Sequence, residues 1–143
     1  MPPTPDSSQL VMAIDPGHIK CGLAILGADG TIVRREVVPA DRLVATLHDC
    51  PAVAVVVVGD GTRSADVLAQ VREHAAAPHC LTRDETGTSL LGRARYWLEN
   101  PPRGLWRLIP TSLRLPPEPF DDWVAVILAE RYLAEESASD VHL

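Results

Sequence analysis

The chain has little lysine and no closely spaced cysteine pair, and each shortage narrows the class of protein. Of the 13 basic side chains among its 143 residues, all but Lys20 are Arg. Arg-rich usage suits contacts with phosphate, although a coding bias toward Arg would give the same composition. The three cysteines are widely spaced and form no C-x-x-C pair (Cys21, Cys50 and Cys80). This pattern argues against a disulfide or zinc scaffold and predicts free thiols in a reduced cytoplasmic protein.

Long apolar segments are also missing. The longest apolar run, 52–58, is far shorter than the ~20 residues that a membrane-spanning helix needs. The first nine residues are rich in Pro and Ser and lack the basic and then apolar pattern of a signal peptide. Hydrophobic residues make up 46% of the chain, which is enough for a core. We therefore expect one soluble cytoplasmic domain with no membrane partner.

The formal net charge of −6 is unevenly distributed along the chain. Residues 1–114 contain 12 acidic and 12 basic side chains, whereas residues 115–143 contain seven acidic side chains and one Arg. Within 83–114, six Arg stand against three acidic residues. The acidic total therefore does not exclude nucleic acid as a partner, because a locally basic segment is present.

Hydrophobic periodicity and turn residues predict an α/β protein. Strands are expected at 10–14, 21–26, 31–38, 52–58 and 79–82, and helices at 41–50, 63–76, 89–99 and 120–136. The Pro-rich segment 104–119 is expected to be a structured loop. An antiparallel run of three strands, then helix, strand, helix, strand and a final helix, is the βββαβαβα order of the ribonuclease H-like fold, within which 89–99 would be an extra helix. We predict a mixed five-stranded sheet with helices on both faces, a flexible tail at 1–9, one domain at 10–136 and an acidic tail at 137–143.

Acidic residues stand at three places where this fold would bring them to one edge of the sheet. Asp15 closes the first strand, Glu85 follows a later strand, and Asp121 and Asp122 open the final helix. Carboxylates gathered at such an edge repel one another unless a cation lies between them, and hard oxygen ligands select Mg²⁺ or Mn²⁺. Two such ions about 4 Å apart can align a water molecule and a phosphate for in-line attack.

Each acid also has an ordinary structural explanation. Asp15 precedes Pro and Gly and could simply form a turn, and Glu85 could be a surface charge. Acidic residues at a helix start, such as Asp121 and Asp122, are favoured by the helix dipole alone. Only the order and spacing of all these positions together favour a metal site.

Three segments carry a resemblance to a known family. Residues 11–17 (Val-Met-Ala-Ile-Asp-Pro-Gly), followed by Cys-Gly-Leu-Ala at 21–24, resemble the opening strand pair of the YqgF family, also called RuvX. Asp-Glu-Thr-Gly-Thr-Ser at 84–89 is similar to its Asp-Glu-Arg-x-Thr segment. Residues 120–133 resemble its closing Asp-x-x-Ala-Ala helix. The family is a ribonuclease H-like branch related to the RuvC Holliday-junction resolvases, and the resemblance runs from about residue 10 to residue 133.

The resemblance implies that Asp15, Glu85 and Asp121 are catalytic residues that bind metal, with Asp122 as a further metal ligand if the helix register slips by one. It implies a phosphodiesterase that hydrolyses nucleic acid, with 5′-end processing of the precursor of the small-subunit (16S) ribosomal RNA as the usual assignment. The chain departs from the family pattern at Thr86, where the family has Arg, at Gly59-Asp60-Gly61, and in an insert around 96–110.

Several residues are candidates for holding the nucleic acid. The turn 59–64 has glycines that would let backbone amides approach a phosphate at a helix start, and its spacing is not that of a nucleotide-binding Walker motif. Thr62 or Ser64 could equally be a helix N-cap that needs no ligand. Trp106 is a candidate for stacking on an unpaired base, whereas Trp97 is expected in the core. The full set of expected nucleic-acid contacts is Lys20, Thr62, Arg63, Ser64, Arg93, Arg95, Trp106 and Arg107.

Other functions stay open at this point. A branched-DNA endonuclease would need two active sites and therefore a homodimer, for which the edge at 31–38 or the insert could provide the contact. A nucleic-acid-binding module without catalysis is the alternative from a different class. An actin-like kinase, the remaining interpretation of Asp-Pro-Gly, needs a second lobe for which 143 residues leave no room.

Overall fold

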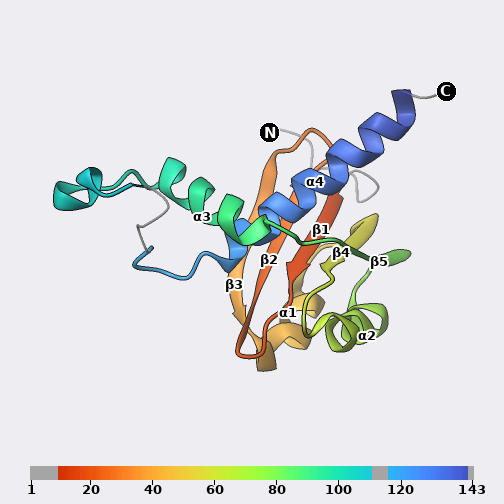
Figure 1. Ribbon diagram of the computed structural model, residues 1–143. Helices are drawn as coiled ribbons and strands as arrows, with labels where there is room; N and C mark the ends of the chain where they lie inside the picture. The colour runs from red at the N-terminus through yellow and green to blue at the C-terminus, as the bar shows by residue number, and fades with distance from the viewer. Residues whose placement is uncertain (1–9, 111–115, 142–143) are drawn as a thin grey trace, which may run out of the picture.

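Five strands form one mixed sheet in the computed structural model, which describes residues 10–110 and 116–141 (Figure 1). The strands are β1 (Leu10–Asp15), β2 (Lys20–Gly27), β3 (Ile32–Pro39), β4 (Val55–Gly59) and β5 (His79–Arg83), in the order β3-β2-β1-β4-β5. The first three pair antiparallel, and β1, β4 and β5 run parallel. The predicted α/β class with a mixed five-stranded sheet is confirmed.

Helices alternate with the later strands in the predicted order. They are α1 (Leu43–Asp49), α2 (Ser64–His74), α3 (Thr88–Glu99) and α4 (Asp121–Val141), with short 3-10 turns η2 (Ala40–Arg42) and η3 (Gly104–Leu108). The tail predicted at 1–9 lies outside the described residues, as do 142–143. The acidic tail was predicted to begin at residue 137, but residues 137–141 belong to α4. Among the described helices, none is both long and apolar enough to cross a membrane.

Side-chain alternation along the central strands builds a core on each face of the sheet. Met12 and Ile14 of β1 face one side, where α1 and α2 cover them through residues such as Leu47 and Val67. The intervening side chains of β1 and β2 belong to the second core, with α3 and α4 (Val11, Ala13, Ala24 and Leu26). Strand β4 is buried along its whole length, as its run of valines predicts. The prediction of helices on both faces is therefore confirmed.

The face that carries α4 is built from small residues. Ala13 and Ala24 of the sheet lie opposite Ala125 and Ala129 of α4 in one buried cluster. Helix α3 packs beside α4 (Figure 1), and a Cβ at Gly92 would lie 2.7 Å from a methyl carbon of Val124. These small side chains let α4 lie close to the centre of the sheet, which positions its first turn beside the end of β1.

Candidate functional site

Three acidic residues from different elements meet where the parallel strands end. Asp15 is the last residue of β1, Glu85 follows β5 by two residues, and Asp121 is the first residue of α4. Burial raises the pKa of the Asp15 carboxyl to about 7, with further contributions from the negative charges of Glu85 and Asp121. The structure thus brings together the three acids that the sequence predicts, and we call them the carboxylate site.

The position of Asp121 depends on a glycine in the neighbouring strand. Gly22 of β2 pairs directly with Asp15 across the antiparallel ladder. A Cβ at Gly22 would overlap the backbone carbonyl of Asp121. Only glycine therefore lets the first turn of α4 lie against β2 at the level of Asp15.

Two further glycines make room for Glu85. A Cβ at Gly59 or at Gly61 would overlap one of the carboxylate oxygens of Glu85. The Glu85 backbone is held at both ends, because its N–H donates to Asp60 Oδ1 (3.2 Å) and its carbonyl accepts from the buried Thr88 hydroxyl (2.7 Å). The turn that is predicted to approach a ligand phosphate thus also lies against the carboxylate of Glu85.

The carboxylate site is electrostatically frustrated. Burial raises the pKa of Glu85, and the charges of Asp60 and Asp84 add to the rise. Its Oε2 atom is buried and has no hydrogen-bond partner. The interaction between the two carboxyl groups raises the pKa of Asp15 and lowers that of Glu85. The chain gathers negative charge here without a complete set of compensating donors.

Asp122 does not join this site, although it was predicted as a further metal ligand. It is 7% exposed and forms an ion pair with Arg35 of β3. Its Oδ1 accepts the Trp123 N–H (3.0 Å), and the Arg35 guanidinium lies 4.0 Å from the centre of the Trp123 ring. The helix turns neighbouring side chains to different directions, so Asp122 is held in this arginine-paired cluster while Asp121 faces β1.

Two predicted phosphate contacts lie near the carboxylate site. The Lys20 ammonium is 3.8 Å from Asp121 Oδ2, with 45% of the Lys20 side chain exposed. Arg63 precedes α2, where its Nε atom is buried without a hydrogen-bond partner and lies 3.4 Å from Asp66 Oδ2. Burial raises the pKa of the Cys21 thiol, and the positive charge of Arg63 opposes part of that rise.

The neighbours of Arg63 do not cap the helix through their side chains. The N-cap position of α2 is Arg63 itself, with no side-chain cap hydrogen bond. Ser64 is the first helical residue, and its N–H donates to the Gly61 carbonyl (3.0 Å). Thr62 is exposed. The structural explanation of Thr62 or Ser64 as an N-cap is therefore wrong, and their hydroxyls remain candidates for contact with a ligand.

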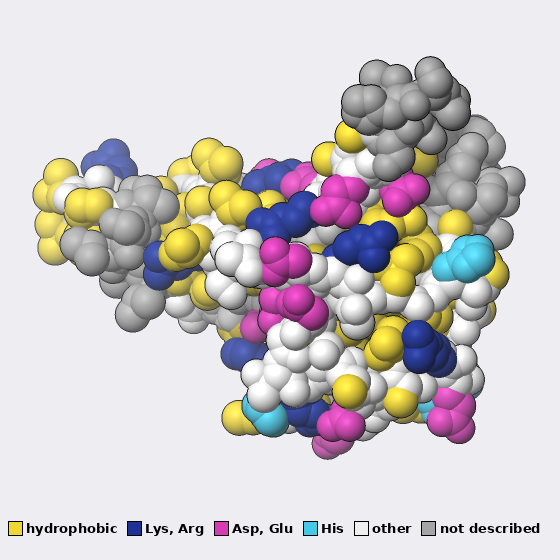
Figure 2. Space-filling view, turned by 45° about the vertical axis from the view of Figure 1, so that its right-hand side comes forward, with side chains coloured by type: hydrophobic (Ala, Val, Ile, Leu, Met, Phe, Trp, Pro, Cys, Tyr) yellow, Lys and Arg dark blue, Asp and Glu magenta, His cyan; other side chains and the backbone are white. Residues whose placement is uncertain are grey.

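The predicted basic rim is only partly available. Arg95 bonds to Glu130 (3.0 Å) and Glu99 (3.4 Å) and lies 5.7 Å from the Trp123 ring centre, so its charge is compensated within the chain. Arg93 is half-buried on α3, and Arg107 is exposed in η3. The backbone of Trp106 lies in η3, but its side chain lies outside the described part. On the face drawn in Figure 2, acidic and basic side chains lie side by side rather than forming one continuous basic surface.

One residue that supports the site has no counterpart in the predictions. Arg131 of α4 donates to the backbone carbonyls of Asp84 (3.3 Å) and Thr86 (2.9 Å). It thereby ties the segment that carries Glu85 to the helix that carries Asp121. A contact between residues more than 40 positions apart leaves no local signal in a sequence, and only the tertiary structure reveals it.

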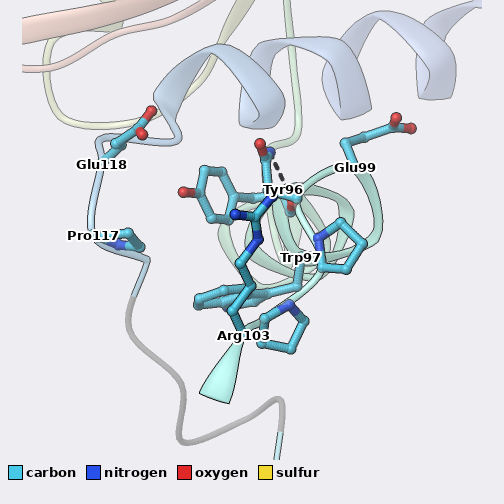
Figure 3. Close-up of a pocket in the computed structure, with 9 residues that line it drawn as sticks. Tyr96, Trp97, Glu99, Arg103, Pro117 and Glu118 are labelled. Carbon is cyan, nitrogen blue, oxygen red and sulfur yellow. Dashed lines mark hydrogen bonds between the residues drawn. The ribbon is translucent and has the colours of Figure 1, made fainter. Parts of the chain in front are cut away.

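A hollow of about 600 Å³ lies at the opposite end of α3. Figure 3 shows the rings of Tyr96 and Trp97 with Arg103 in this hollow, and Glu99 and Glu118 at its sides. The lining carries one cation against two carboxylates, which disfavours a phosphate ligand. Trp97 is 8% exposed, so its predicted place in the core is confirmed.

The chemistry of the carboxylate site suits a hard divalent cation. Asp15, Glu85 and Asp121 offer only oxygen donors, and the buried, unpartnered Oε2 of Glu85 would gain a partner from a bound ion. Within 10–110 and 116–141, no three His, Cys, Asp or Glu side chains already form a group that could hold a metal ion. The three carboxylates therefore suit such an ion in donor type and charge but are not arranged as a ligand set, and Asp121 lies 3.8 Å from Lys20.

Comparison of the chain with protein-family models and with curated proteins finds no match. The functional inference therefore depends on the residues and contacts described above.

Proposed function

We propose that this protein is a divalent-metal-dependent nuclease with a ribonuclease H-like fold, related to the YqgF family. The observed element order and the mixed sheet support the proposal, because they agree with the order that the resemblance implies. The three acids of the resembling motifs lie at one sheet edge, where open α/β sheets commonly bind ligands. The proposed ion is Mg²⁺ or Mn²⁺, and the proposed substrate is RNA.

The observation that carries the proposal is that the acids of the carboxylate site are buried together without enough hydrogen-bond donors or cations to compensate them. Asp15 has a pKa raised to about 7 by burial and by its acidic neighbours, and Glu85 has a buried oxygen without a partner. A purely structural cluster would pair such groups with cations, as the chain does for Asp122. Unpaired charge of this kind is a mark of functional sites.

Different residues of the chain would bind the cation, position its carboxylate ligands and contact the substrate. Asp15, Glu85 and Asp121 would hold the cation, which when bound supplies Lewis acidity and an acidified water molecule. Gly59 and Gly61 fix the carboxylate of Glu85, and Gly22 fixes the first turn of α4. Lys20, which lies beside Asp121, and Arg63, which precedes α2, would contact the substrate phosphate. Because these groups stand on strand ends and a helix start, they form a rigid frame.

The direct test compares single-stranded RNA, precursor small-subunit ribosomal RNA and a four-way DNA junction as substrates with Mg²⁺ or Mn²⁺. We expect cleavage of RNA that disappears without the ion and in Asp15→Asn. The matched control is Asp29→Asn, in the exposed turn before β3, which should cleave at the wild-type rate. Circular dichroism of each variant checks that the fold is retained.

Each other outcome changes the proposal in a defined way. Cleavage of the junction alone would replace RNA by branched DNA as the substrate and predict a homodimer. Tight RNA binding without cleavage would identify a binding module that has lost catalysis. An unchanged cleavage rate in Asp15→Asn would overturn the assignment of the carboxylate site.

A further inference from the structure

Two histidines from different helices meet on the face of the sheet opposite α4. His48 lies in the last turn of α1, and His74 is the last residue of α2. His48 Nε2 lies 3.1 Å from His74 Nδ1, and the ring centres are 5.1 Å apart at an interplanar angle of 70°. His48 is exposed and His74 is half-buried. The carboxylate site does not use these residues.

The spacing of the two nitrogens matches that of neighbouring ligands on one metal ion. With Zn–N bonds of ~2.0–2.1 Å, two imidazole nitrogens at a tetrahedral angle lie ~3.4 Å apart. In the square-planar geometry of Cu²⁺ or Ni²⁺ the adjacent nitrogens lie ~2.9 Å apart. The observed 3.1 Å falls between these values.

A carboxylate stands behind one of the two rings. Glu73 Oε2 lies 3.7 Å from His74 Nε2, the nitrogen that does not face His48. Metal-binding histidines commonly direct their second ring nitrogen toward a carboxylate, which fixes the tautomer and increases the basicity of the ligating nitrogen. His74 and His48 therefore resemble two metal-binding histidines, and Glu73 resembles the carboxylate that supports one of them.

From this geometry we infer that His48 and His74 form a two-ligand site for a borderline divalent transition ion such as Zn²⁺, Ni²⁺ or Cu²⁺, with water completing the coordination. Imidazole ligands favour these ions over the Mg²⁺ or Mn²⁺ proposed for the carboxylate site. The site is therefore chemically distinct from the proposed catalytic one. A bound ion would join the ends of α1 and α2 and stabilise the layer that covers this face of the sheet.

Isothermal titration calorimetry and thermal unfolding of the full chain with Zn²⁺ or Ni²⁺ test the inference, with Mg²⁺ as the control ion. We expect one ion per chain at the pair and a melting temperature that rises with ion concentration. His48→Gln and His74→Gln should each abolish both effects. Glu73→Gln should weaken binding by up to about 10-fold. His79→Gln, an exposed histidine at the start of β5, should leave binding unchanged.

Two results would overturn the inference. One is the absence of any saturable binding of Zn²⁺ or Ni²⁺ by the wild-type chain, in which case the pair is an ordinary hydrogen bond between two imidazole rings. The other is binding that survives in both His→Gln variants but disappears in Asp15→Asn, which would place the ion at the carboxylate site. Neither result depends on nuclease activity, so the proposed function is tested separately.

Discussion

Two adjacent acids at the start of α4 experience opposite environments. Asp121 faces Asp15 in the carboxylate site, and a partly exposed Lys20 at 3.8 Å is its cationic neighbour. Asp122 is buried in the arginine-paired cluster, where Arg35 and the backbone of Trp123 satisfy both of its oxygens. The same residue type is thus satisfied within the fold at Asp122 and lies in a cluster of carboxylates at Asp121. This contrast supports a packing role for Asp122 and the proposed metal-binding role for Asp121.

The largest expected effect is on the cleavage rate, which should depend on Asp121 and not on Asp122. Asp121→Asn removes a negative charge from the carboxylate site, and we expect the cleavage rate to fall by on the order of 1000-fold while the fold is retained. Asp122→Asn should keep its cleavage rate per folded molecule. It should lose about 2 kcal/mol of stability, because Arg35 is left without its partner but is partly exposed. Initial rates and urea unfolding of both variants measure the contrast, and the reverse pattern would exchange the two roles.

Next in size is the effect of a methyl group at Gly22. Gly22→Ala would push against the backbone carbonyl of Asp121, which cannot move without shifting α4. We expect a loss of about 2–3 kcal/mol in the free energy of unfolding. The matched variant is Gly61→Ala, for whose methyl group the three nearest atoms all belong to the carboxylate of Glu85. Because a side chain can rotate away, this variant should lose less stability but more activity, and equal losses of stability would contradict this explanation.

The strain on Asp15 predicts a dependence of stability on pH. Its pKa of about 7 in the folded chain, against 3.8 for the ordinary side chain, means that the folded state binds more protons between these values. The stability of the metal-free wild type relative to Asp15→Asn should therefore fall as the pH rises from about 4 to 7, and stay level above 7. Thermal unfolding of both proteins across this range, without divalent ions, measures the difference. A constant difference from pH 4 to 8 would contradict the raised pKa.

Much of the fold could be predicted because its signals are local. The valines of β4 and the turn after Asp15 mark buried strands and their ends, and the order of elements followed from them. The convergence of Asp15, Glu85 and Asp121 could also be predicted, since strand ends and a helix start meet at one edge.

The supporting contacts could not be predicted, because they join distant residues. Nothing local indicates that Arg95 is occupied by Glu130 rather than free for phosphate. The choice between Asp121 and Asp122 depends on how α4 is rotated against the sheet, which Gly22 fixes through its close contact with the backbone of Asp121. The fit of Glu85 between Gly59 and Gly61 likewise needed the tertiary structure.

The smallest expected effect concerns Arg131, which links the two halves of the carboxylate site. Arg131→Lys would lose at least one of the two hydrogen bonds to the carbonyls of Asp84 and Thr86, because an ammonium cannot reproduce the planar guanidinium. Both bonds are exposed, so we expect a loss of about 1 kcal/mol in stability or less. Activity should fall several-fold, since Glu85 would no longer be held in line with Asp121. Arg72→Lys, on the exposed surface of α2, is the control and should change neither quantity. If Arg131→Lys lowers stability but not the cleavage rate, the residue only supports the fold, and the orientation of Glu85 depends on Asp60, Thr88 and the space left by Gly59 and Gly61.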